Sequence, residues 1–160
     1  MVPVPSPAFR TSTDADEGVG TTFETKRSFG VPGGLVYNAV SGTGVLVRDG
    51  HACPTGHGEI GAKTAVGADR AGRVLYLVVV DGKQPHYSEG LYMQELADLL
   101  PATIPGIYAA IVVDGGGSST MAAQLPGGGT ELLNSPINMY VVGWERAVAN
   151  HLAVYAPPAP

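Results

Sequence analysis

The chain has 160 residues, including 23 glycines and 13 prolines, and only 14% of its residues are charged. Long helices avoid glycine and proline and depend on charged surface residues, so this composition excludes a coiled coil or a helical bundle. Hydrophobic residues make up 44% of the chain. This is enough apolar material for one folded domain with a buried core, and it argues against wholesale disorder.

The charge balance limits the partners of the protein. The formal net charge is −5, and the lysines and arginines form no cluster. Nucleic-acid binding depends on a basic surface, so we expect no nucleic-acid partner. The longest apolar runs, residues 74–80 and 108–113, are far shorter than the ~20 residues that span a bilayer, so we expect no membrane partner. The oligomeric state stays open, and a homo-oligomer is compatible with the sequence.

The cysteine content and the N-terminus bear on the cellular compartment. Cys53 is the single cysteine, so no disulfide forms within the chain. Residues 1–7 have neither the basic region nor the apolar region of a signal peptide. We therefore expect a cytoplasmic protein by default.

The two ends of the chain differ in composition from its middle. Residues 1–20 are rich in proline, threonine and aspartate and show no periodicity, which predicts a flexible N-terminal segment. Residues 156–160 predict a proline-rich tail. Between these segments we expect a single domain over residues 21–155.

The first part of this domain predicts short strands. Residues 35–40 and 44–48 predict a strand pair joined by a glycine-rich turn, and Asp49-Gly50 predicts a second tight turn. Residues 64–66 predict a short strand. The continuous apolar run within residues 73–80 is typical of a strand that is buried on both faces.

One segment, residues 91–100, predicts a helix. Its apolar residues at helical spacing are Tyr92, Leu96, Leu99 and Leu100. Ser88 is a candidate for the N-terminal cap, and Pro101 is expected to end the helix.

The remainder of the chain predicts further strands. Residues 108–113 predict a second buried strand, and residues 121–125, 139–144 and 151–155 predict three more. Many strands with one main helix predict an α+β fold around a mixed β-sheet. The strand–helix–strand order across residues 73–113 is compatible with one crossover between parallel strands.

The motif Asp114-Gly-Gly-Gly-Ser-Ser-Thr120 directly follows a predicted buried strand. Three glycines allow a ligand to approach the main chain closely, and successive N–H groups can form a site for an anion. A hairpin turn is the alternative, because Asp-Gly between two strands is a strong hairpin signal. No Gly-Lys-Ser/Thr follows, so the motif is not a phosphate-binding loop of the nucleotide-binding type.

Three other segments carry candidate site residues. Residues 81–90 also follow a predicted buried strand, and if the two strands are parallel neighbours, both loops emerge at the same edge of the sheet. Glu145-Arg146 offers either a phosphate ligand or a surface ion pair. His57 lies in a glycine-rich loop, where a solvated histidine is the favoured alternative. No set of histidine, cysteine and acidic residues has zinc or calcium spacing, so we expect no metal and no cofactor.

Taken in order, several motifs resemble those of the phosphodiester glycosidase family. The motifs are Lys63-Thr-Ala-Val-Gly67, Val78-Val-Val-Asp-Gly-Lys-Gln-Pro85 with Tyr87-Ser88 and Gly90, Glu95-Leu-Ala97, Asp114-Gly-Gly-Gly-Ser-Ser-Thr120, Asn134-Ser-Pro136, and Glu145-Arg146 with Val148-Ala-Asn150. The resemblance runs from about residue 36 to residue 155, and it implies an enzyme of the same α+β fold.

The resemblance implies a hydrolase that cleaves a glycosyl phosphodiester, a small-molecule substrate, at the anomeric carbon of the sugar. Such an enzyme stabilises the departing phosphate and an oxocarbenium-like sugar. The catalytic candidates are Asp114, Arg146 and Lys63, with Asp81 and Glu89 as second choices for the carboxylate. The substrate-binding candidates are Gly115, Gly116, Gly117, Ser118, Ser119, Lys83, Tyr87, Ser88, Tyr92, His57 and Asn150.

Several departures from the family pattern keep two alternatives open. Lys63 and Lys83 stand where the family usually has arginine, and these side chains bind phosphate differently. Tyr92 replaces a usual threonine, and the family's upstream Asn-Gly-Gly-Phe-Phe segment is not recognisable in residues 1–34. One alternative is a biosynthetic enzyme that performs a non-hydrolytic transformation of a larger natural product. The other is a non-catalytic module that binds carbohydrate or phosphate.

Overall fold

The structure is a computed structural model that describes residues 7–14, 18–25, 38–149 and 151–155. Strands β1 (Pro7–Asp14), β2 (Gly18–Thr25) and β3 (Asn38–Ser41) form an antiparallel sheet in the order β2-β1-β3. Strand β1 and the start of β2 therefore occupy part of the segment expected to be flexible. Residues 1–6 and the predicted tail at 156–160 lie outside the described residues.

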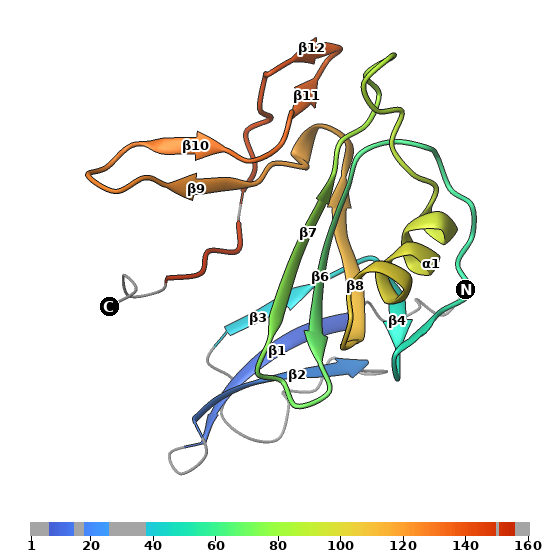
Figure 1. Ribbon diagram of the computed structural model, residues 1–160, viewed down its shortest axis with the longest axis vertical. Coiled ribbons are helices and arrows are strands. Elements are labelled where there is room, and N and C mark those ends of the chain that lie inside the picture. The colour runs from blue at the N-terminus through green and yellow to red at the C-terminus, as the bar shows by residue number, and fades with distance from the viewer. Residues whose placement is uncertain (1–6, 15–17, 26–37, 150, 156–160) are drawn as a thin grey trace.

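A five-stranded sheet forms the centre of the molecule (Figure 1). Its strands are β4 (Gly44–Arg48), β5 (His51–Ala52), β6 (Lys63–Asp69), β7 (Leu75–Val80) and β8 (Ile107–Gly115), in the order β5-β4-β8-β6-β7. One helix accompanies these strands, so the α+β fold class is confirmed. The expected mixed sheet is wrong, because each described pairing in it is antiparallel.

The physical reason is the position of β6 between β7 and β8. Strand β6 runs antiparallel to both neighbours, so β7 and β8 run in the same direction without touching. Lys63, the first residue of β6, pairs with Val80 on one side and with Gly115 on the other. The loops that follow β7 and β8 therefore start at the same edge of the sheet, although the two strands are not the parallel neighbours that the sequence argument assumed.

The predicted strand pair at residues 35–40 and 44–48 is also wrong. Strand β3 pairs with β1, whereas β4 pairs with β5 and β8. The tight turn at Asp49-Gly50 is confirmed, and both residues have the positive φ that such a turn requires (53° and 79°). Strands β3 and β4 do not pair with each other because strands from other parts of the chain, β1 and β8, occupy their hydrogen-bonding edges. The local spacing of residues does not reveal such distant partners.

Burial differs between the two most apolar strands. In the central strand β8, Ile107 and residues 109–112 are buried, as predicted. Strand β7 lies at the edge of the sheet, and Leu77 remains 41% exposed, so the expected burial on both faces is wrong. An edge strand has a neighbour on one side only, and its apolar run alone does not identify that position.

Helix α1 (Met93–Thr103) connects β7 to β8 and packs on one face of the sheet (Figure 1). Its buried residues are Leu96, Ala97 and Leu100, which join the larger core cluster, whereas Leu99 is 43% exposed. The helix continues past Pro101, because a proline in the last turn removes only one hydrogen bond. The N-terminal cap is Tyr92, whose N–H donates to Glu95 Oε2 (2.8 Å), and not Ser88.

The segment after β8 forms two small hairpins. Strands β9 (Ala122–Gln124) and β10 (Thr130–Leu132) make one, and β11 (Ile137–Asn138) and β12 (Val141–Val142) make the other. The predicted strand at residues 151–155 is not formed.

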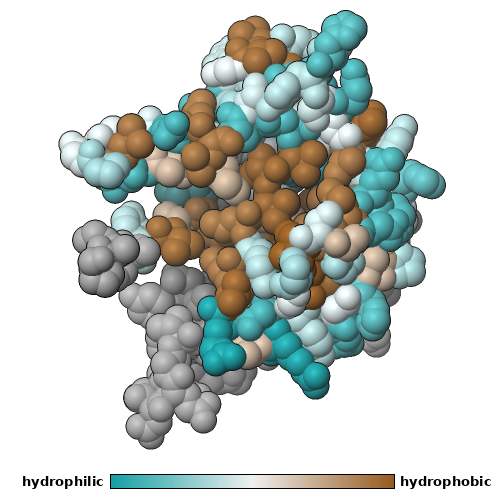
Figure 2. All heavy atoms as spheres, in the orientation of Figure 1, coloured by the Kyte–Doolittle hydropathy of each residue, from teal (hydrophilic) through white to brown (hydrophobic). Residues whose placement is uncertain are grey.

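Several hydrophobic side chains stay exposed on this part of the molecule. Figure 2 shows hydrophobic residues on the β9–β10 hairpin and on the face that carries β7. Leu125 is 43% exposed and Leu133 is 57% exposed. In the described part of the chain, no helix is long and apolar enough to cross a membrane.

Candidate active site

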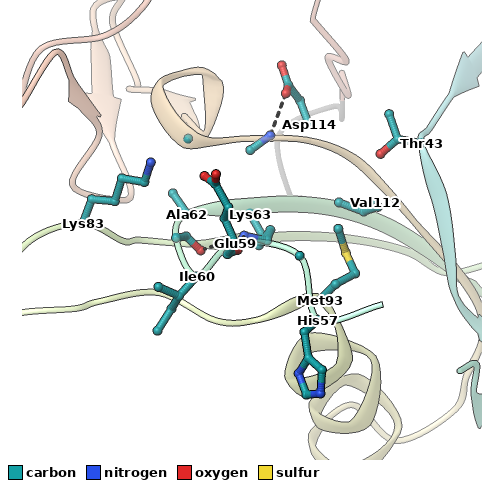
Figure 3. A pocket seen from close by; sticks show the side chains of 14 residues that line it. Thr43, His57, Glu59, Ile60, Ala62, Lys63, Lys83, Met93, Val112 and Asp114 are labelled. Atoms are coloured by element: carbon teal, nitrogen blue, oxygen red, sulfur yellow. Dashed lines mark hydrogen bonds between the residues drawn. The ribbon is translucent and has the colours of Figure 1, made fainter. Parts of the chain in front are cut away.

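A pocket of about 310 Å³ lies at the edge of the sheet where β7 and β8 end (Figure 3). The loop before β6, the end of β8, the first residue of α1 and the chain before β4 contribute to it. Its lining residues are Thr43, His57, Gly58, Glu59, Ile60, Gly61, Ala62, Lys63, Lys83, Met93, Val112, Asp114, Gly115 and Gly116. The structure thus brings together six sequence-predicted site residues: Asp114, Lys63, Lys83, His57, Gly115 and Gly116.

Close backbone contact holds the loop before β6 against the loop after β7. Gly61 and Leu91 exchange two main-chain hydrogen bonds (3.4 Å and 3.2 Å). Gly90 has φ +92°, and a Cβ atom on it would lie 2.3 Å from the carbonyl carbon and oxygen of Gly61. A side chain at Gly90 is therefore incompatible with this contact, so glycine at this position allows the loop that carries the pocket residue Gly61 to pack closely here.

Two lysines face the pocket. Lys63 is only 9% exposed, and its Nζ donates hydrogen bonds to the carbonyl oxygens of Glu59 (3.0 Å) and Gly61 (3.2 Å). Burial lowers the pKa of Lys63, the nearby charge of Lys83 lowers it further, and the nearby carboxylate of Glu59 offsets part of this lowering. The alkyl chain of Lys83 lies over Gly61. A bound anion would relieve the repulsion between the two ammonium groups, so this end of the pocket suits an anionic ligand.

Two carboxylates also line the pocket. Asp114 is exposed, and its Oδ1 accepts a hydrogen bond from the N–H of Gly115 (2.7 Å). Glu59 lies on the loop before β6 (Figure 3). Within the described residues, its carboxylate accepts no hydrogen bond from a side chain or the main chain. The sequence reasoning missed Glu59, and the only available signal was its place four residues before Lys63 in a glycine-rich loop.

The glycine motif forms a turn of 3-10 helix, Gly116–Ser118, directly after β8. Strand β8 does not pair with β9, so the alternative of a simple hairpin is excluded. The N–H of Gly115 donates to Asp114 Oδ1, and the N–H of Gly116 donates to the carbonyl oxygen of Ala62 (2.9 Å). Two of the three glycine amides expected to bind an anion therefore already have partners inside the protein.

Arg146 lies against this turn but does not line the pocket. A Cβ atom on Gly117 would lie 2.8 to 2.9 Å from the guanidinium group, so the two groups are in close contact. The Nε of Arg146 donates to Asn138 Oδ1 (3.2 Å). This contact explains why glycine occupies position 117, and it places the arginine beside the turn.

Asp81 holds a network of hydrogen bonds outside the pocket. Its carboxylate accepts from Asn134 Nδ2 (2.8 Å), from the N–H of Ser135 (3.0 Å to Oδ2) and from the hydroxyl of Tyr87 (3.0 Å). The last of these bonds raises the pKa of Tyr87. Asn134 in turn binds the carbonyl oxygen of Ser119 and the N–H of Met121. Asp81 therefore connects three loops and acts as a structural acceptor.

We expect Asp81→Asn to lower the free energy of unfolding by about 2 kcal/mol, because hydrogen bonds to an ionised acceptor are among the stronger ones. Urea unfolding followed by circular dichroism measures this change. Tyr87→Phe removes one exposed partner of the same carboxylate and is expected to cost less than about 0.5 kcal/mol. Equal effects of the two substitutions would contradict the structural role.

The other predicted residues lie outside the pocket lining. Ser119 is 1% exposed, and its Oγ lies 3.0 Å from Thr64 Oγ1. Ser88 Oγ donates to the carbonyl oxygen of Asp81, and Tyr92 makes an edge contact with His57 at 5.8 Å between ring centroids. Gly117, Ser118, Tyr87 and Glu89 do not line the pocket either. Asn150 lies outside the described residues.

The structure adds residues that the sequence reasoning did not select. Thr43 and Met93 line the pocket alongside Glu59. Gln84 is 5% exposed and exchanges two hydrogen bonds with Ser135 (2.7 Å and 2.9 Å), which supports the network around Asp81. No group of three histidine, cysteine or acidic side chains in the described ranges could hold a metal ion.

Comparisons with known proteins agree with this fold. The sequence profile of the phosphodiester glycosidase family matches residues 8–155. The solved catalytic domain of zebrafish N-acetylglucosamine-1-phosphodiester alpha-N-acetylglucosaminidase, auto-inhibited by its pro-peptide, has a similar fold with a TM-score of 0.58. The two chains are 22% identical, and the similarity covers 84% of this chain and 46% of the zebrafish chain. This chain thus matches about half the length of that catalytic domain. No curated protein matches the sequence significantly.

Proposed function

Because this chain belongs to the phosphodiester glycosidase family, we propose that it is a hydrolase that cleaves a glycosyl phosphodiester at the anomeric carbon of the sugar. The observation that carries the proposal is the joint presence of two lysines and two carboxylates in one pocket: Lys63, Lys83, Glu59 and Asp114. Lysines suit the phosphate, and carboxylates suit the sugar and the attacking water.

The proposed reaction breaks the bond between the anomeric carbon and the phosphate oxygen. Water supplies a hydroxyl group to the sugar, and the phosphate leaves as a monoester with the electron pair of the broken bond. The second pKa of such a phosphate is about 6, so it departs at neutral pH without a strong general acid. Asp114 takes the proton of the attacking water or stabilises the positive charge on the sugar, and Glu59 is the second carboxylate available for either task.

The lysines bind the phosphate group in this proposal. The Nζ atom of Lys63 has one proton beyond its two bonds to carbonyl oxygens, and Lys83 lies nearby on the loop after β7. Arg146 is proposed to support the glycine turn through its contact with Gly117. The Asp81 network holds the same turn from the other side, through Asn134 and Ser119.

Isotope labelling tests the proposal directly. A sugar joined through its anomeric oxygen to phenyl phosphate is incubated with the protein in water enriched in oxygen-18, and the products are analysed by mass spectrometry. We expect free sugar together with phenyl phosphate that contains no oxygen-18. Label in the phenyl phosphate would show cleavage at phosphorus instead. A product that retains all atoms of the substrate would favour a non-hydrolytic transformation, and unchanged substrate would favour a binding module.

The lowered pKa of Lys63 leads to a prediction about pH. A lysine with a lowered pKa loses its proton, and with it its attraction for phosphate, at a lower pH than an ordinary lysine. Binding of phenyl phosphate is therefore expected to weaken as the pH rises through that lowered pKa, below the usual value of 10.5. Lys63→Arg keeps its charge across this range, so its binding is expected to persist to higher pH.

Competitive inhibition constants for phenyl phosphate, measured from pH 6 to pH 10, test this prediction. Lys63→Met serves as the matched control, because it removes the charge at each pH and is expected to bind weakly throughout. The same pH dependence in the wild type and in Lys63→Arg would show that another group controls binding.

A further inference from the structure

The pocket has two chemically different sides. Figure 3 shows Lys83 at the side away from Met93, Val112 and Thr43, with Glu59 and Lys63 between them. The side chain of Met93 extends from the start of α1 toward Val112 on β8. Lys83, Lys63 and Glu59 thus lie toward one side, where Ile60 also lies, and Met93, Val112 and Thr43 form a wall on the other side.

We propose that this wall, formed by Met93, Val112 and the methyl group of Thr43, is a subsite for an apolar group esterified to the phosphate of the substrate. The inference rests on the proposed function, because it assumes that the lysines hold the phosphate. A hydroxyl-rich group placed against Met93 and Val112 would lose its hydrogen bonds to water, and this wall offers only the Thr43 hydroxyl in return. The sugar therefore lies toward the carboxylates, and the apolar group lies against the wall.

The wall is preformed by the fold. Val112 is 2% exposed in the central strand, and its carbonyl oxygen accepts a hydrogen bond from the N–H of Thr43 (2.9 Å). The N–H of Met93 donates to the carbonyl oxygen of His57 (3.1 Å), and the Met93 side chain packs against the core cluster. A ligand can therefore use this surface without ordering new residues, and the flexible methionine can adapt to its shape.

The size of the pocket favours a small apolar group. Its volume of about 310 Å³ lies near the lower end of ligand-binding pockets, which is roughly 300 Å³. A phenyl or short alkyl ester fits this limit better than a second sugar does. The substrate class is thus a sugar 1-phosphate esterified to a small apolar alcohol or phenol.

Calorimetry with two phosphate monoesters tests the subsite without requiring turnover. Phenyl phosphate and glycerol 3-phosphate carry the same charged group, but only the first carries an apolar one. We expect the wild type to bind phenyl phosphate about tenfold more tightly, which corresponds to burial of about 55 Å² of apolar surface. Equal dissociation constants for the two esters, or no binding of phenyl phosphate, would overturn the inference.

Variants of the wall provide the second arm of the experiment. Met93→Gln is expected to remove the preference for phenyl phosphate, whereas Met93→Leu preserves it. Thr43→Val changes an exposed residue and enlarges the apolar wall, so it is expected to increase the preference even if Met93→Gln fails to fold. A preference that is unchanged in both Met93→Gln and Thr43→Val would place the apolar group elsewhere.

The outcomes separate this inference from the proposed function. If phenyl phosphate is preferred but the glycosyl phosphodiester is not cleaved, the proposed reaction fails and the subsite stands. If the phosphodiester is cleaved but the two monoesters bind equally, only the subsite fails.

Discussion

Asp114→Asn is expected to lower kcat for the proposed hydrolysis by about 1,000-fold while leaving KM and the melting temperature nearly unchanged. General acid–base groups contribute roughly 100- to 10,000-fold to catalysis, and an amide cannot take up the proton of an attacking water. The fold should be preserved, because the described hydrogen bond of Asp114 comes from the N–H of Gly115, and the Oδ1 atom of asparagine can still accept it. Steady-state kinetics with the phenyl phosphodiester measure the effect.

Two other substitutions complete this test. Glu59→Gln removes the second carboxylate of the pocket and is expected to lower kcat as well, because both carboxylates line the same pocket. Glu131→Gln is the matched control, since Glu131 is an exposed carboxylate in β10 outside the pocket. An Asp114→Asn variant with the activity of the control would remove Asp114 from the mechanism.

Gly90→Ala is expected to destabilise the protein by more than about 4 kcal/mol, which is exceptional for one methyl group. The positive φ of Gly90 already disfavours alanine, and the new Cβ would lie 2.3 Å from the carbonyl of Gly61. Relief of this clash requires separation of the loop before β6 from the loop after β7. Since domains are stable by only about 5 to 15 kcal/mol, the variant should unfold at low denaturant concentration.

Gly56→Ala is the matched control for this prediction. Gly56 precedes the same pocket loop, has no positive φ, and an added Cβ there would meet no atom within 4 Å. Its free energy of unfolding should stay within about 0.5 kcal/mol of the wild type. Urea unfolding curves of the two variants are compared. A loss below 1 kcal/mol in Gly90→Ala would show that Gly90 and Gly61 do not bring the two loops into close contact.

The acidic residues near the site show how far local sequence can identify a functional group. Asp114 follows a buried strand and precedes three glycines, which makes it a candidate from sequence alone, and in the structure it lines the pocket. Asp81 follows a strand in the same way, yet its carboxylate binds Asn134 and Ser135 instead. These partners lie 53 and 54 residues away in the chain, so only the folded structure reveals that this carboxylate is occupied. Glu59 carries no local signal of comparable strength.

Local patterns determined the strand–helix–strand succession, the buried strand β8, the α+β class and the candidate residue Asp114, whereas Lys63 became a candidate through the resemblance to the phosphodiester glycosidase family. Apolar periodicity and glycine-rich turns act over a few residues, so they are visible in the chain itself. Only the tertiary structure decided that β6 lies between β7 and β8. This position places Lys63, the first residue of β6, beside the last residues of both neighbouring strands. The tertiary structure also decided which acidic side chains face the pocket. Strand pairing and loop packing depend on contacts between residues far apart in sequence, which local patterns do not contain. The sequence shows that glycine is abundant, but only the structure shows where glycine is required, as at Gly90, whose backbone touches that of Gly61.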